Sequence, residues 1–223
     1  MKLVHSLLNE IFILNDEEKV NILVVENQNL FTELLVDLNN QINKQEGGFI
    51  LSKDNTPIEI FNNMILLTEF IAFEINKRTL VNKLYKRSDI ISQNEDFYLK
   101  TKELYSYISE YAFNLSDYIG FDIDFLNEFS VSSILKAIDF KFREDYLTIS
   151  EKIIEYMLLV RELEGDMCFV LVNLRNYISD NEIDDFYKTV LYNKLKVLII
   201  SANDYPCSVY EKKTIIDKDL CEF

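Results

Sequence analysis

The sequence predicts an α/β fold with a mostly parallel sheet and an inserted all-helical domain. Nearly unbroken apolar runs occur near both ends of the chain, at 20–26, 168–173 and 195–200, and such runs are typical of strands covered on both faces. The middle of the chain instead carries apolar residues at helical spacing. Only four glycines and two prolines occur among 223 residues, which favours long helices over a loop-rich all-β fold.

The first part of the chain predicts short strands around one helix. The helix is expected over 30–42, because its leucines recur at helical spacing. Two short strands around a turn are predicted at 3–14, and one buried strand at 20–26. Gly47 and Gly48 predict a turn into a short strand at 49–51. Residues 64–69 fit either a buried strand or the start of a helix.

The middle of the chain predicts helices. Apolar residues recur every three or four positions from Leu104 to Ile119, and Gly120 then supplies a suitable C-cap. A shorter helix is expected at 130–138. We therefore expect an α-helical leg domain at 74–146, inserted into a discontinuous head domain made of residues 1–73 and 147–223.

The last part of the chain predicts a strand–helix–strand unit. Thr148 with Glu151, and Ser179 with Glu182, have the spacing of capping boxes at helix N-termini. The second of these helices lies between the apolar runs at 168–173 and 195–200. A helix between two buried strands predicts a parallel pair.

Composition limits the class of protein. Apolar residues make up 48% of the chain and the net charge is −15, so a folded acidic protein is expected. Cys168, Cys207 and Cys221 are far apart, which predicts free thiols and a cytoplasmic location. No apolar run approaches the roughly 20 residues that span a bilayer, so no membrane partner is expected.

The phosphate loop of a nucleotide-binding fold is missing. The turn after the strand at 20–26 reads Glu26-Asn27-Gln28-Asn29, with no glycine or lysine, so the head resembles a degenerate P-loop fold and no nucleotide is expected. His5 is the only histidine, and a structural role is expected for it because no triad can be built around it. Cys168, inside a strand, is expected in the core.

Two charged clusters remain as candidate sites. The first is a run of five cations without an intervening acid: Lys77, Arg78, Lys83, Lys86 and Arg87. Tyr85 lies among them. The run fits either a solvated helix face or a strip that contacts phosphates. A sparser basic set follows at Lys136, Lys141 and Arg143. The second cluster is acidic. In an extended segment Asp122 and Asp124 would share one side, near Glu128, and oxygen ligands suit Ca²⁺ better than Zn²⁺.

Three stretches resemble one known family. VNILVVENQNLFTELL, DYIGFDID followed by FSVSSILKAIDFKF, and CFVLVNLRNYISDNEIDDFYKTVLYNKLKVLIISANDY occur in this order. They are similar to the Csn-two family, an accessory spacer-acquisition protein of CRISPR type II-A systems. The resemblance covers most of the chain and is strongest over 168–205.

This resemblance implies a head distantly like a P-loop kinase or ATPase, a helical leg, and no catalytic activity. It implies a homotetrameric ring whose lysine-lined hole takes the ends of double-stranded DNA without sequence preference, and calcium that holds the ring in its binding shape. The partners it implies are the CRISPR integrase and the RNA-guided effector nuclease. Lys136 and Lys141 fall where the family places lysines that face DNA. The loop before them, where the family's calcium ligands lie, is shorter and less acidic here and leaves Asp122, Asp124 and Glu128.

Two other functions stay open. An acidic oligomer could serve as a protein scaffold of the adaptation complex, with DNA binding minor. A metal-dependent nuclease could use Asp122, Asp124 and Glu128, although such sites usually add a lysine or histidine and take Mg²⁺ or Mn²⁺.

Overall fold

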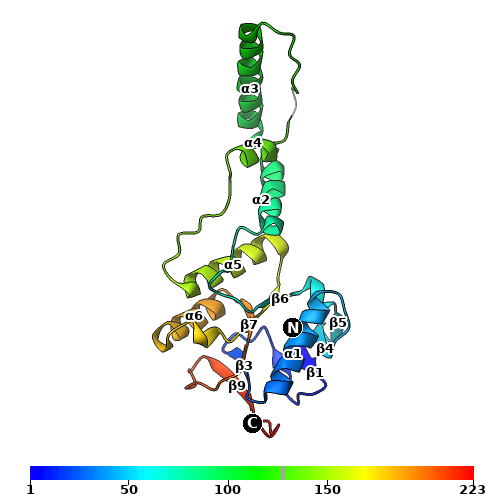
Figure 1. Ribbon diagram of the computed structural model, residues 1–223, viewed down its shortest axis with the longest axis vertical. Coiled ribbons are helices and arrows are strands. Elements are labelled where there is room, and N and C mark those ends of the chain that lie inside the picture. Colours follow the sequence, from blue (N-terminus) through cyan, green and yellow to red (C-terminus); the bar gives the residue numbers. More distant parts are fainter. Residues whose placement is uncertain (127–128) are drawn as a thin grey trace. The chain divides into compact units, whose positions relative to one another are not determined.

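The computed structural model describes residues 1–126 and 129–223. Its backbone divides into two compact units, one made of residues 1–73 and 145–223 and the other of residues 74–144. The first unit contains every strand of the described residues, and the second contains helices only (Figure 1). The predicted α/β class with a parallel sheet is confirmed.

A five-stranded parallel sheet forms the centre of the first unit, in the order β6-β7-β8-β3-β9. The apolar runs predicted as buried strands are three of its members, and the ambiguous run at 64–69 is a strand rather than a helix. The bounds of the strands are Val20–Val25 for β3, Met64–Leu67 for β6, Cys168–Val172 for β7, Lys196–Ser201 for β8 and Glu211–Ile216 for β9.

A small antiparallel sheet lies against this core, in the order β2-β1-β4-β5. Its strands are Lys2–His5, Phe12–Ile13, Phe49–Lys53 and Thr56–Ile58 for β1, β2, β4 and β5. The hairpin from β4 to β5 turns at Asp54 and Asn55, whose φ angles of 51° and 62° are those of a two-residue type I′ turn. The two strands predicted at 3–14 are confirmed as β1 and β2.

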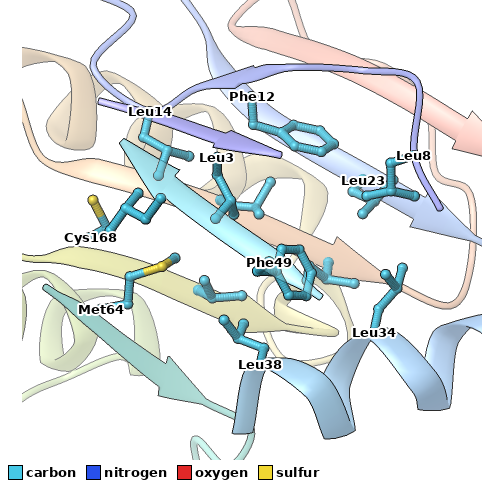
Figure 2. Packing of buried hydrophobic residues seen from close by; sticks show 14 of the residues in the cluster. Leu3, Leu8, Phe12, Leu14, Leu23, Leu34, Leu38, Phe49, Met64 and Cys168 are labelled. Atoms are coloured by element: carbon cyan, nitrogen blue, oxygen red, sulfur yellow. The ribbon is translucent and has the colours of Figure 1, made fainter. Parts of the chain in front are cut away.

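Helices cover the faces of the large sheet. They are α1 (Gln28–Ile42), α5 (Ile149–Glu164) and α6 (Asp180–Tyr192), with short 3-10 turns at Ile60–Asn62 and Leu174–Asn176. Alternate residues of β7 divide between two layers: Cys168 and Val170 enter a cluster with α1 and the small sheet, whereas Phe169 contacts Tyr156 of α5. Figure 2 shows Leu3, Phe49, Leu34 and Leu38 converging on that cluster from the small sheet and α1.

The second unit contains α2 (Arg78–Ile91), α3 (Tyr98–Ile119) and α4 (Val131–Ala137). The predicted C-cap is confirmed, since Gly120 ends α3 in the left-handed conformation with φ 72°. In α3 none of the 22 residues is buried, and large apolar side chains such as Tyr107, Tyr111 and Tyr118 are 70%, 70% and 94% exposed.

Two local predictions need correction. The capping box at Thr148 and Glu151 forms in full, but the one at Ser179 and Glu182 does not: the Ser179 hydroxyl donates to the Glu182 carboxylate, 3.2 Å away, and caps no backbone N–H. Strand β9 was not predicted. It is an edge strand with Lys212 exposed and Lys213 half-buried, so it lacks the apolar run of a central strand.

Candidate nucleic-acid interface

The negative charge of the chain is unevenly divided between the two units. Residues 74–144 carry ten lysine and arginine residues against twelve acidic ones, so only −2 of the net charge of −15 falls there. All eight cations predicted to contact DNA lie in this unit. The field that repels a polyanion is therefore concentrated on the other unit.

Helix α2 presents a basic face to solvent. Lys83, Lys86 and Arg87 follow one another at helical spacing along α2, in which Leu80 is buried. Lys86 and Arg87 are exposed and Lys83 is half-buried.

The start of α2 is also basic, which lowers the stability of the helix. Lys77 is its N-cap and Arg78 its first residue, without an acidic residue in the first turn or a side-chain cap. Cations are unfavourable at this positive end of the helix dipole.

Helix α4 brings the second basic set against α2. The Ser132 backbone N–H donates to Oδ1 of Asp89 over 2.8 Å, which joins the N-terminus of α4 to α2. One turn along α2, the Lys136 ammonium lies 5.5 Å from the centre of the Tyr85 ring, within range of a cation–π contact. Lys136 thus lies against the helix that carries the first basic set, about 50 residues earlier in the sequence.

The segment after α4 runs beside the start of α2. Asn76 and Phe142 exchange two hydrogen bonds of 2.9 Å, and this pairing places Lys141 and Arg143 near Lys77.

Lys141 is partly neutralised by its own loop. Its ammonium lies 2.5 Å from the Asp139 carboxylate, and hydrogen bonding to Asp139 raises the lysine pKa. Of the two lysines that the family resemblance assigns to DNA, Lys136 is therefore the more available for phosphate.

The predicted calcium ligands are only partly described. Asp122 and Asp124 are exposed and lie in a segment that is neither helix nor strand, and Glu128 lies outside the described residues. Within residues 1–126 and 129–223, no group of three or more histidine, cysteine or acidic side chains is arranged to hold a metal ion. The calcium site stays a prediction.

The position of a phosphate loop is occupied by polar side chains. The Asn27 side chain caps α1 and accepts hydrogen bonds of 3.1 Å from the backbone N–H groups of Asn29 and Leu30. A crevice of about 720 Å³ opens at the carboxyl ends of the neighbouring strands, where Glu26 and Asp204 supply carboxylates. Lys218 also lines this crevice, and Asn27 occupies backbone N–H groups at the start of α1.

Comparison with known proteins assigns the chain to a family. The family model for the CRISPR-associated protein (Cas_Csn2) matches residues 41–220, which is most of the chain. The chain belongs to the Csn-two family. Its role is thus associated with CRISPR systems. No curated protein sequence matches the chain. Among the described residues, no helix is long and apolar enough to cross a membrane.

The two side chains considered first for catalysis in this Csn-two member are structural. Cys168 is 1% exposed, and burial raises the pKa of its thiol to about 12, so it is a poor nucleophile. His5 is 4% exposed and lies 3.1 Å from Asp37. The predicted core position of Cys168 is confirmed.

Two clusters were not found from the sequence. Arg175, in the 3-10 turn after β7, and Glu211, the first residue of β9, form a buried ion pair across 36 residues of sequence, and only the polar residues after β7 hinted at it. A cavity of about 620 Å³ in the helical unit has Tyr98, Tyr105 and Phe129 in its wall. For the second cluster, the aromatic and basic residues that lie close together in FYLKTKELY were a signal that could have indicated it.

Proposed function

We propose that this chain is a non-catalytic CRISPR adaptation protein that binds the ends of double-stranded DNA without sequence preference. The observation that carries the proposal is the meeting of two basic sets on residues 74–144, with Lys136 over Tyr85. Contacts from lysine and arginine to phosphates supply affinity but no sequence information.

A closed ring reconciles DNA binding with the acidic composition. In a homotetramer the lysine and arginine residues would line a central hole, while acidic residues would face outward. The exposed apolar side chains of α3 support self-association, because a 22-residue helix without a buried residue is unusual in a monomer. On this proposal residues 74–144 are the family's leg, and the other unit is a P-loop-like head that binds no nucleotide.

Calcium has a defined place in the proposal. Asp122 and Asp124, with Glu128, would supply oxygen ligands just before α4, and bound Ca²⁺ would offset acidic charge close to Lys136. The complex would assist the CRISPR integrase and the RNA-guided effector nuclease in acquiring new spacers.

A gel-shift comparison tests this function. One plasmid, linearised or closed circular, is mixed with the protein in Ca²⁺ and again in chelator. A shift of the linear form alone, and only with Ca²⁺, supports a threaded ring. Equal binding to both forms contradicts the ring, since it requires an open surface.

A protein scaffold is the second candidate, favoured by the concentration of acidic residues outside residues 74–144. Failure to shift either form of the plasmid would favour it over DNA binding.

A further inference from the structure

The helical unit contains a cavity with an aromatic wall. It has a volume of about 620 Å³ and lies between the end of α2, the first turns of α3 and the approach to α4. A hydrogen bond of 3.1 Å from the Thr101 hydroxyl to the Ser92 carbonyl joins α2 to α3 beside it. This volume is within the range of about 300–1,000 Å³ that is usual for small-molecule pockets.

Three rings in the wall suit a flat ligand. Tyr105 and Phe129 pack edge to face with centroids 4.6 Å apart, and burial raises the pKa of Tyr105. Tyr98 is 49% exposed, so much of its ring remains open to a ligand. Every nucleobase has a π-face that stacks on such rings.

Polar groups of the same cavity match the edge and the phosphate of a nucleotide. The side chain of Gln93 makes no hydrogen bond within the described residues, and its amide both donates and accepts. The Lys102 ammonium lies 5.8 Å from the centre of the Tyr98 ring, at the rim.

The cavity continues the basic face of α2. Lys86 lies six residues before Ser92, the C-cap of α2 that lines the cavity, so the two are roughly 9 Å apart along the axis at about 1.5 Å per residue. A strand whose phosphate contacts Lys86 can therefore bring a nearby base to the aromatic wall.

We propose that this pocket binds an unpaired nucleobase at the end of a DNA strand, stacked on Tyr98 and Tyr105. The proposal rests on the DNA-end binding proposed above and adds a preference for frayed or overhanging ends. An unpaired base can turn into the pocket by itself, whereas each base at a blunt end is held by its partner and exposes only the outer face of the last pair.

The test uses a DNA hairpin labelled in its loop, so that each molecule has one open end. Three ends are compared by fluorescence anisotropy with the full chain: blunt, one unpaired nucleotide, and one unpaired abasic nucleotide. The abasic end keeps the phosphate and lacks the base. We expect the unpaired base to bind about tenfold more tightly than the abasic end, because only the base can stack on the aromatic rings.

Two substitutions locate the effect. Tyr98→Leu and Tyr105→Leu should each reduce the difference between the base and the abasic end, while the exposed control Tyr192→Leu in α6 should keep it. Tyr98 is half exposed, so its replacement leaves the fold intact even if Tyr105→Leu does not.

The outcomes separate the two proposals. Equal affinity for base and abasic ends, or a difference that survives Tyr98→Leu, overturns the pocket while blunt-end binding still supports the proposed function. No binding to any end, in Ca²⁺, overturns both.

Discussion

His5 and Asp37 join β1 to α1 through a hydrogen bond of 3.1 Å between Nε2 and Oδ2. The Leu7 backbone N–H donates to Nδ1 of the same ring, so Nε2 carries the hydrogen and donates to the carboxylate. Asp37 also accepts from the Gly48 backbone N–H over 2.9 Å. The only histidine of the chain is thus a tie between the small sheet and a helix.

This tie predicts a loss of stability in acid. The hydrogen bond from His5, and to a lesser degree the one from Gly48, lower the pKa of Asp37 below its ordinary value of 3.8. A lowered carboxyl pKa in the folded state adds stability above the unfolded pKa, and that stability is lost as the pH falls through the folded pKa. Urea unfolding between pH 2.5 and 6 should show a steeper acid loss for the natural chain than for Asp37→Asn. If the free energy of unfolding falls equally with pH in both chains, the lowered pKa of Asp37 is contradicted.

Any side chain at position 48 in place of glycine is predicted to destabilise the fold. A Cβ at this position would lie 2.3 Å from Nε2 of His5 and 2.9 Å from Oδ2 of Asp37. Gly48→Ala must push the pair apart, and overpacking of this kind costs roughly 1–3 kcal/mol. Thermal unfolding should show a lower Tm. Gly120→Ala is a useful comparison, because a Cβ there meets no atom within 4 Å and only the positive φ opposes it.

The two capping sequences predict unequal effects of the same substitution. Thr148→Ala removes a cap from the Glu151 N–H and should lower the free energy of unfolding by about 1 kcal/mol. Ser179→Ala should cost much less, since that hydroxyl caps no backbone group. Urea denaturation of both variants measures the difference, and equal losses would show that Ser179 caps α6 in solution.

The central strands could be predicted from the sequence because both of their faces are buried, so β3, β7 and β8 read as apolar runs. The edge strand β9 could not, because it lies at the edge of the sheet and begins with three charged residues, Glu211, Lys212 and Lys213. The cations of α2 were visible as a local run. Their meeting with Lys136 was not, because it depends on the Asp89–Ser132 hydrogen bond, which forms only in the folded chain.

Arg175 is predicted to be essential for stability, because it forms an ion pair with Glu211 at the start of β9. It lies 3.1 Å from the Glu211 carboxylate, whose side chain is 0% exposed and also accepts from the Tyr187 hydroxyl over 2.7 Å. Arg175→Met leaves that carboxylate buried without its cation, which costs roughly 3–5 kcal/mol. Adding Glu211→Gln should recover part of the loss. Urea denaturation of the single and double variants tests this, and additive losses would contradict the pairing.

Substitutions of Lys136 and of Asp139 are predicted to have opposite effects on DNA affinity. Lys136 forms no ion pair within the described residues, so Lys136→Gln should weaken binding and lower the slope of log K against log salt by about 1. Asp139→Asn should strengthen binding, because it frees the Lys141 ammonium now held at 2.5 Å. Lys194→Gln makes the same change of charge on the other unit and serves as the control.

Fluorescence anisotropy with linear duplex at several salt concentrations gives all three slopes. If Lys194→Gln weakens binding as much as Lys136→Gln, net charge rather than this surface governs the affinity.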